Sequence, residues 1–464
     1  MSRIVILTTE PLPLEGWPTT GAGLRTWGLG QGLRSRGHDV RLMMPEDAAS
    51  GFSPGKDAKP PTRHFPDWIQ TFNRSRLKED PRVNDCDVLL LQHWGIARDL
   101  GEIHVPLAID LAGPHLLERK LWGSPSPEND LLEKLDALRR ADFLSASGEY
   151  QRYYFLPYLG MAGWDIGSNR DPLPVIPYSL QADANPSPVR NDRFIYGGFF
   201  LPWQNPARAI GILLDELESA GRGELVFIGG AHPLVDVSRG QFESLLQRLR
   251  SHPQVRLIDS VGYDDYVQIL REGAIALDLM ERNAERELAF TTRTVQFMAC
   301  GLPVIHDNYS ELGRIIEDHD AGWTCDPNDD SRLHSIFRGL LRGETDPQQK
   351  AHNALNLVAE KLDWNKTIGP LDEFCKAPTF RGDKLASQLA FEGRERRLQI
   401  VEKELEESRA ELNTFRGKRW VQWGMKAVSL RSWLAWPAAV AATLFGLFLI
   451  PIFWINDRFG RPPH

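Results

Sequence analysis

Short apolar runs alternate with amphipathic stretches along the first 168 residues, and this alternation restricts the possible fold more than any other feature. The apolar runs are aliphatic and nearly uncharged, at residues 3–9, 40–43, 87–92, 107–110 and 143–146. Between them apolar residues recur at helical spacing, as Leu24, Trp27, Leu29 and Leu33 do. Such repeats predict βαβ units around a parallel sheet.

A proline-rich segment at residues 169–192 separates this half of the chain from a second half of similar texture. Its five prolines preclude a continuous helix and indicate a linker. Apolar runs resume at 193–196, 224–228, 255–258, 275–279 and 303–305. The sequence therefore predicts an α/β protein with two doubly wound, Rossmann-like domains, at residues 1–168 and 193–376. A ligand cleft is expected between them, at the carboxyl ends of the strands.

A heptad pattern occupies residues 384–415. Its seam positions are separated by three and four residues, at Phe391, Arg394, Leu398, Val401, Leu405, Ser408, Leu412 and Phe415. This spacing predicts a coiled coil through which the chain forms a homodimer. The alternative is a single amphipathic helix that packs on the preceding domains.

Residues 433–455 contain no charged residue over 23 positions. A helix of this length is about 35 Å long, which is enough to cross a hydrocarbon core of roughly 30 Å. Indole rings mark both ends and basic residues precede the run, at Trp433, Trp436, Trp454, Lys418, Arg419, Lys426 and Arg431. The pattern predicts an interfacial amphipathic helix at 417–431 and a transmembrane helix at 433–455. It places the preceding domains at the cytoplasmic face of the inner (plasma) membrane.

Two other structures remain open for residues 433–455. The run could be a buried helix of a soluble core, or a segment that re-enters the membrane without crossing it. Pro437 and Pro451 keep the second alternative open because each removes an amide donor and favours a kink.

Charge and cysteine content exclude several classes of protein. The formal net charge of −8 and a pI near 5.9 argue against a general nucleic-acid-binding protein, which needs a basic face. The four cysteines have neither a CxxC pair nor zinc-ligand spacing, which is typical of reduced thiols. No metal site is predicted, and the N-terminus has no recognisable signal peptide.

A candidate anion site lies at residues 291–301. Thr291 and Thr292 have the character of an N-cap before a helix that ends at Gly301. A helix N-terminus that faces the cleft presents free amides and the positive end of its dipole to an anion. Arg293 beside it could pair with a phosphate. The same pattern also occurs in capped helices that bind nothing.

Candidate residues in the first domain follow its strands. Gly21 and Gly23, with Arg25 just after, allow the backbone to approach a diphosphate or an acceptor closely. A nicotinamide-binding loop is rejected, because Thr26 stands where its third small residue belongs and the strand end at Arg41 to Pro45 lacks an acid. Asp110 ends a predicted strand and His115 follows five residues later, so both could point toward the cleft; His115 could instead be structural.

Several segments resemble the GT-B glycosyltransferases of the retaining family 4 type, over about residues 1–376. The string FMACGLPVI at 297–305, with Ser310-Glu311-Leu312 after it, resembles their donor-site helix. The segment GAGLRTWGLGQGLRSRGHDV resembles their first glycine loop and helix. ADFLSASGEYQR and FIYGGFFLPWQNP resemble segments late in the first domain and early in the second. Trp364, Leu371 and Phe374 resemble the final helix that crosses back to the first domain.

The resemblance implies a nucleotide-diphosphate sugar as donor and transfer with retention of configuration, without a metal. In that family two glutamates eight positions apart flank the donor site. Here Gln296 occupies the second position, where its amide can hold a ribose hydroxyl, and Leu288 occupies the first. Glu285 or Glu287 is expected to lie near the transferred sugar instead. A His or Asp in the region of Asp110 and His115 contacts the reacting sugar in that family.

With the C-terminal segments, the resemblance predicts a glycosyltransferase that acts on a lipid-linked glycan acceptor in bacterial surface-polysaccharide synthesis. Two alternatives stay open. One is a catalytically inactive scaffold that dimerises through residues 384–415 and recruits other enzymes to the membrane. The other is a different GT-B activity, such as epimerisation of a sugar nucleotide.

Overall fold

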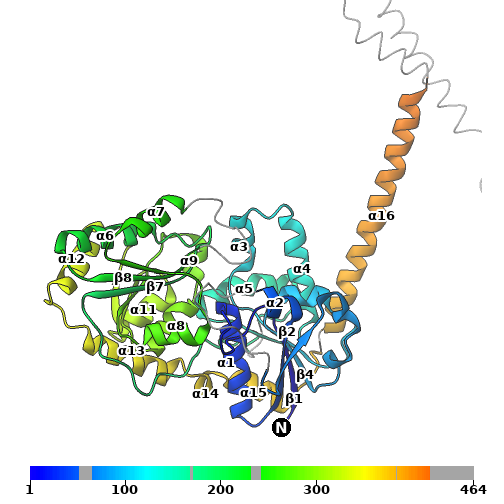
Figure 1. Cartoon of the computed structure of the whole chain (residues 1–464). Helices are drawn as coiled ribbons and strands as arrows, with labels where there is room; N and C mark the ends of the chain where they lie inside the picture. The colour runs from blue at the N-terminus through cyan, green and yellow to red at the C-terminus, as the bar shows by residue number, and fades with distance from the viewer. Residues whose placement is uncertain (52–64, 168–170, 231–241, 383, 419–464) are drawn as a thin grey trace, which may run out of the picture. The chain divides into compact units, whose positions relative to one another are not determined.

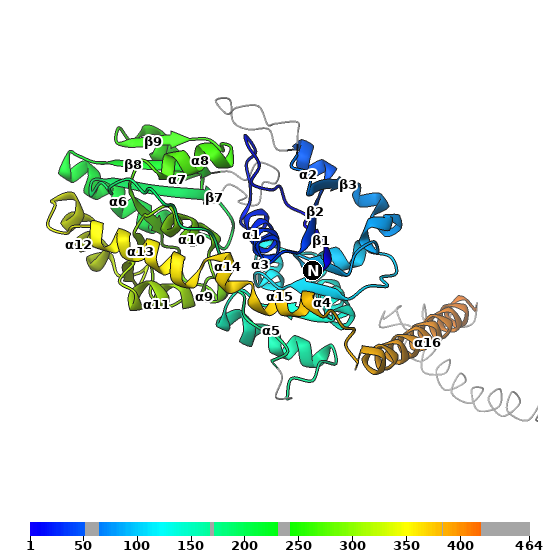
Figure 2. The same cartoon turned by 90° about the horizontal axis from the view of Figure 1, so that it is seen from below.

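The computed structural model describes residues 1–51, 65–167, 171–230, 242–382 and 384–418. The chain divides into two compact units, Met1–Ser387 and Gln388–His464. The first unit holds two parallel sheets with helices on both faces of each (Figures 1 and 2).

The first sheet is six-stranded and entirely parallel, in the order β3-β2-β1-β4-β5-β6. Its strands are β1 (Arg3–Leu7), β2 (Asp39–Pro45), β3 (Ile69–Phe72), β4 (Val88–Leu91), β5 (Leu107–Asp110) and β6 (Phe143–Ser145). Its helices are α1 (Gly21–Ser35), α2 (Glu46–Gly51), α3 (His115–Trp122), α4 (Pro127–Arg140) and α5 (Glu149–Met161), with short 3-10 turns η1 (Arg74–Glu79), η2 (Pro81–Val83) and η3 (Trp94–Asp99). Central strands of such a sheet are covered on both faces, which explains their continuous apolar runs.

The second sheet repeats this topology in the order β12-β11-β10-β7-β8-β9. Its strands are β7 (Arg193–Phe199), β8 (Glu224–Gly230), β9 (Val255–Ile258), β10 (Ile275–Asp278), β11 (Val304–Asp307) and β12 (Gly322–Cys325). Its helices are α6 (Ala207–Ala220), α7 (Glu243–Ser251), α8 (Tyr263–Leu270), α9 (Ala284–Leu288), α10 (Thr292–Ala299), α11 (Glu311–Asp318), α12 (Asp330–Leu341) and α13 (Gln348–Lys361). In both sheets the strand order reverses between the first and fourth strands, so the two predicted Rossmann-like folds are confirmed.

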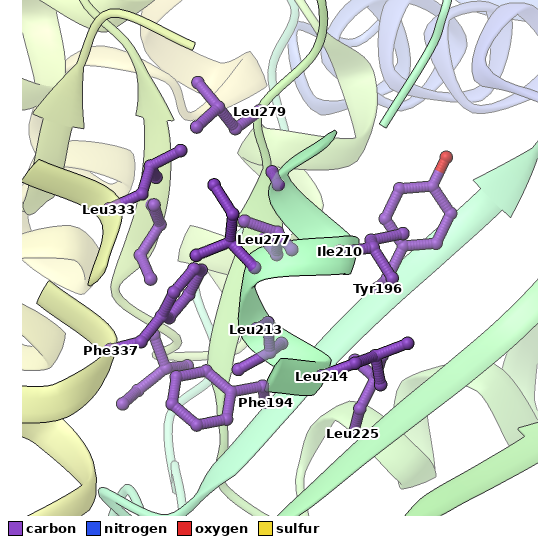
Figure 3. Close-up of a cluster of buried hydrophobic side chains, with 14 of the residues drawn as sticks. Phe194, Tyr196, Ile210, Leu213, Leu214, Leu225, Leu277, Leu279, Leu333 and Phe337 are labelled. Carbon is purple, nitrogen blue, oxygen red and sulfur yellow. The ribbon is translucent and has the colours of Figure 1, made fainter. Parts of the chain in front are cut away.

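The core of the second domain fixes β7 beside β10. Phe194 of β7 and Phe337 of α12 meet edge to face, with ring centroids 5.6 Å apart. Figure 3 shows Leu213 of α6 and Leu277 of β10 in the same buried cluster. Because such interiors are close-packed, the carboxyl ends of β7 and β10 are held at fixed positions.

The last helices of this unit return to the first domain, as the sequence predicts. They are α14 (Trp364–Thr367) and α15 (Gly369–Lys376), which lie beside α1 (Figures 1 and 2). Leu371 and Phe374 belong to a buried cluster of the first sheet. The Phe374 ring stacks on the Phe143 ring, with their centroids 4.9 Å apart. His38 Nε2 lies 3.0 Å from Asp372 Oδ1. Both domains are therefore tied together by the linker and by this return.

Two edge strands, β3 and β12, are not predicted by the sequence pattern. Each has four residues, and each pairs with one neighbour only. Polar or small residues interrupt both strands, Gln70 and Thr71 in β3 and Gly322 and Thr324 in β12, so neither shows an apolar run. Residues 319–321 connect the end of α11 to β12.

Residues 384–415 belong to one long helix, α16 (Lys384–Gly417). Five of its predicted seam residues have exposed apolar side chains, Leu398, Val401, Leu405, Leu412 and Phe415. Their pairing with a second helix remains a prediction. Among the described helices, none combines the length and the hydropathy that a membrane crossing requires. The predicted helices at 417–431 and 433–455 lie outside the described residues, apart from positions 417 and 418.

The first domain buries a lysine without a hydrogen-bond partner. Lys134 of α4 is fully buried, and within the described part of the chain its Nζ makes no hydrogen bond. Nζ lies 4.8, 4.5 and 3.7 Å from the ring centroids of Tyr154, Phe155 and Tyr158 of α5. Burial lowers the pKa of Lys134 to about 7, because an ammonium ion loses its hydration there.

We expect Lys134→Met to stabilise the protein by about 2–4 kcal/mol at pH 7. The unfolded lysine has a pKa of about 10.4, so between pH 7 and 10.4 the unfolded parent holds the extra proton. The stability of the parent therefore rises with pH across this window, at up to about 1.4 kcal/mol per pH unit. Urea unfolding at pH 7 and 9.5 should show a gap between variant and parent that shrinks at the higher pH. Lys120→Met, at an exposed position of α3, is the control. If the difference in unfolding free energy between Lys134→Met and the parent does not change with pH, the lowered pKa of the buried Lys134 is contradicted.

Candidate functional site

A cavity of about 560 Å³ lies between the two domains. Its wall includes Gln92, which follows β4, and Gly197 and Gly198 at the end of β7. These positions are next to the reversal of strand order in each sheet, where ligands of doubly wound folds bind.

The N-termini of two helices meet at this cavity. Helix α1 begins at Gly21 after its N-cap Thr20, and α10 begins at Thr292 after its N-cap Thr291. A Cβ atom on Gly21 would lie 2.4 Å from Thr292 Oγ1, so a side chain there would have to displace the Thr292 side chain. Gly21 and Thr292 both line the cavity. The positive ends of both helix dipoles therefore face the same space, which favours a bound anion.

Gly23 has a different position from the one expected. Its amide donates to Thr20 Oγ1 at 3.1 Å, and it does not line the cavity. A Cβ atom there would lie 2.0 Å from the carbonyl oxygen of Pro11. Gly23 thus packs the start of α1 against the loop after β1.

Arg293 lies in the wall of the cavity, in the first turn of α10. Its guanidinium donates to the Tyr196 hydroxyl at 3.1 Å and to Gln204 Oε1 at 2.6 Å. Nη1 is 3.6 Å from Oδ1 of the buried Asp278. Burial alone lowers the pKa of Arg293, but Tyr196 and Asp278 reverse this and raise it. The cation is therefore held in place before any ligand arrives.

Gln296, one turn further along α10, also lines the cavity. Its Oε1 accepts a hydrogen bond from the Tyr263 hydroxyl at 2.6 Å, and its Nε2 donates to Cys300 Sγ at 3.3 Å. The sulfur is a weak acceptor, so the amide nitrogen keeps donor capacity for a ligand hydroxyl.

Arg25 and Asp110 form an ion pair with each other. Arg25 Nε and Nη2 donate to the two carboxylate oxygens at 3.0 and 2.8 Å, and Nη1 donates to the Pro177 carbonyl at 2.6 Å. The side chains are 3% and 0% exposed. Arg25 reaches the cavity wall, whereas Asp110 does not. The pair joins α1 to the end of β5 and to the linker.

His115 and Glu118 form a dyad on the cavity side of α3. His115 Nδ1 lies 2.8 Å from Glu118 Oε2, and both residues line the cavity. His115 Nε2 is buried and makes no hydrogen bond to the described residues. Burial alone lowers the pKa of His115, but the Glu118 carboxylate outweighs it and raises the pKa. When the ring is protonated both of its nitrogens carry a proton, so Nε2 can then donate to a ligand in the cavity.

Of the two candidate glutamates, Glu285 lines the cavity and Glu287 does not. Glu285 is 2% exposed, and its oxygens accept from Arg286 Nε and Nη2 at 2.5 and 2.7 Å. Burial raises the pKa of Glu285, and Arg286 opposes this only in part. Glu287 pairs with Arg282 at 2.8 Å on the outer side of α9. Leu288 is likewise absent from the cavity wall.

Sequence reasoning missed several residues of the wall. Glu118 could have been found, because a position three residues after His115 shares its helix face. Arg286 adjoins the candidate Glu285 but has no motif of its own. Tyr178 and Tyr266 lie in the linker and in α8, and no periodic pattern singles them out.

No group of three or more His, Cys, Asp or Glu residues is arranged to hold a metal ion within the described ranges. Asp85 and Asp87 pair with Arg3 at the entrance to β4. Asp320 pairs with Lys350.

Comparisons with known proteins relate this geometry to one enzyme class. Residues 212–371 match a family model described as glycosyl transferase-like. Curated protein sequences contain no significant match to the chain.

Several solved structures have a similar fold. Sucrose-phosphate synthase from Thermosynechococcus elongatus aligns over 81% of this chain and 98% of its own, at 13% identity and a TM-score of 0.54. A trehalose-6-phosphate protein from E. coli, bound with UDP-2-fluoro glucose, aligns over 82% and 100% at 12% identity, with a TM-score of 0.57. An alpha-glucosyltransferase in complex with UDP aligns over 81% and 100% at 12% identity, with a TM-score of 0.52. At these identities the likeness establishes the two-domain GT-B fold.

Proposed function

We propose that this chain, which carries a glycosyl transferase-like domain in a GT-B fold, transfers a sugar from a nucleoside-diphosphate donor to a lipid-linked glycan. The acceptor places the reaction at the cytoplasmic face of the bacterial inner membrane, in surface-polysaccharide synthesis. The enzyme class matches the expectation from the sequence; the acceptor and the membrane location are proposals.

One observation carries the proposal: the N-termini of α1 and α10 and the guanidinium of Arg293 converge on a single interdomain cavity. A diphosphate leaving group gains negative charge as the glycosidic bond breaks. Two helix dipoles and a fixed cation stabilise that charge without having to reorganise. Gln296 would hold the ribose through its amide.

The remaining roles follow from position in the cavity. Glu285, held by Arg286, would lie beside the transferred sugar. His115 would donate from Nε2 to a hydroxyl oxygen of the reacting sugar. Retention of configuration follows from the family resemblance alone, and the proposal includes no metal. Arg25 and Asp110 would support the site through their ion pair, which sets the position of α1.

One feature of the C-terminal segments supports the membrane location, and another supports a homodimer. Residues 433–455 carry no charge, and the exposed apolar stripe of α16 at Leu398, Val401 and Leu405 offers a surface for a second copy. An anchored enzyme meets a membrane-bound acceptor at a raised effective concentration. We propose that residues 384–415 form the homodimer contact and that 433–455 form the anchor.

Arg293→Ala should weaken binding of the nucleoside diphosphate by about 1.5–3 kcal/mol, the range for hydrogen bonds to a charged group. Gln296→Ala should weaken binding less, by about 0.5–1.5 kcal/mol, because the variant loses only a hydrogen bond between two neutral groups, the amide and a ribose hydroxyl. Isothermal titration of UDP, GDP and ADP into the purified full-length protein measures both.

The control for Arg293 is Arg208→Ala, which removes an exposed arginine of the second domain that pairs with Asp330. Unchanged affinity in the Arg293 variant rules out the proposed donor site. An inactive scaffold is favoured instead if the parent binds a nucleotide sugar but transfers nothing to membrane lipid extracts. The absence of an acid at Leu288 is the observation behind that alternative.

A further inference from the structure

The linker places one tyrosine hydroxyl in the cavity wall without a partner. Tyr178 is 1% exposed and lines the cavity. Its hydroxyl oxygen is buried and makes no hydrogen bond to the described part of the chain. Buried hydroxyl groups almost always have a partner, so this one calls for an explanation.

The backbone on both sides of Tyr178 is anchored. The Pro177 carbonyl accepts hydrogen bonds from Arg25 Nη1 at 2.6 Å and from the Ser179 hydroxyl at 2.9 Å. Ser179 Oγ also lies 2.8 Å from Thr367 Oγ1 of α14. The ring is therefore held between α1 and the return to the first domain, and a phenol has few rotamers to lose on binding.

The ring shares a buried cluster with residues of the two helices at which the diphosphate is expected. Tyr178 packs in one buried cluster with Leu24 of α1 and with Phe290 and Val295, which lie just before and within α10. Those helices are the two whose N-termini face the cavity. The unpartnered hydroxyl thus belongs to a residue of the same cavity wall as Gly21 and Thr292, the first residues of those helices.

We propose that Tyr178 donates a hydrogen bond to a phosphate oxygen of the bound nucleoside diphosphate. The inference rests on the proposed donor site and adds a binding residue from the linker, which belongs to neither Rossmann-like domain. An unmet buried donor destabilises the free protein, and a charged acceptor oxygen removes that cost on binding. The Tyr178 hydroxyl is therefore preorganised in the free protein to bind the anion.

Tyr178→Phe tests this in the full-length protein with two readouts. Removing the unmet hydroxyl should leave the ligand-free melting temperature unchanged or raise it by about 1–3 °C. Affinity for UDP, or for GDP if GDP is the nucleotide bound, should fall about 10-fold to 100-fold by titration calorimetry. Weak binding of the corresponding nucleoside, which has no phosphate, should not change.

Tyr154→Phe is the matched control, because its hydroxyl is also buried but does not line the cavity. It should leave nucleotide affinity unchanged. The inference is overturned if Tyr178→Phe binds the nucleotide like the parent, or if it weakens the nucleoside equally. A lower melting temperature with unchanged affinity would also overturn it, since the hydroxyl then has a structural partner. If the parent itself binds no nucleoside diphosphate, the proposed function fails, and this inference fails with it.

Discussion

Replacing Glu285 by glutamine should lower the turnover number about 100-fold while nucleotide affinity stays within about twofold. The Glu285 carboxylate lies in the cavity and is held by two hydrogen bonds from Arg286. A neutral amide of the same shape keeps the packing but removes the charge that we propose to lie beside the transferred sugar. An interaction made mainly in the transition state affects turnover and leaves ground-state binding intact. Steady-state kinetics with a radiolabelled sugar nucleotide, together with titration calorimetry, separate the two quantities.

Glu287→Gln is the matched control, two positions along the same short helix. Its carboxylate pairs with Arg282 at the surface, and the variant should retain turnover within about twofold. Glu285→Gln leaves Arg286 beside a neutral amide. Melting temperatures of both variants show whether this change destabilises the protein. A larger loss of turnover in Glu287→Gln than in Glu285→Gln would give the role near the sugar to Glu287.

Replacing Asp110 by alanine should reduce the free energy of unfolding by about 3–5 kcal/mol. Both carboxylate oxygens bind the Arg25 guanidinium, and Oδ1 also accepts from the Ser145 hydroxyl at 2.9 Å. The substitution leaves a cation that is 3% exposed without its counter-ion. Denaturant unfolding of parent and variant, followed by tryptophan fluorescence and far-UV circular dichroism, measures the loss.

The double variant Arg25→Met, Asp110→Leu separates charge from packing. Apolar residues of similar volume often replace a buried pair at little cost, so most of the stability should return. If Asp110→Ala folds as stably as the parent yet loses turnover, Asp110 acts in the chemistry and our structural interpretation of the pair is wrong.

Most of the fold could be predicted from local pattern. The strands 107–110 and 255–258 were placed to the residue, because each is a run of period-two or continuous apolar residues between polar turns. The edge strands β3 and β12 could not be found, because Gln70 and Thr71 interrupt the first and Gly322 and Thr324 interrupt the second. The helix at 292–299 was predicted from its cap and its end at Gly301, both of which are local signals.

The residues of the candidate site also fall into two groups, those that a local pattern brings together and those that only distant contacts bring together. Thr292, Arg293 and Gln296 reach one cavity because a single helix carries them, so their spacing was enough to group them. The roles of Arg25 and Asp110 depend on a contact between residues 85 positions apart, which no local pattern reveals. The choice between Glu285 and Glu287 depends on which face of α9 turns toward α3 and α5.

The amino-acid sequence by itself determined two doubly wound domains, a linker and the helix at 292–299, because strand and helix periodicity, caps and prolines act over a few residues. Only the tertiary structure decided which polar groups are free to meet a ligand. Arg25 and Gly23 lost their expected ligand roles to neighbours that became adjacent on folding, whereas His115, Glu285 and Tyr178 were brought to the cavity. The physical reason is that a buried polar group binds whatever partner the packing provides, and packing joins residues that the sequence keeps apart.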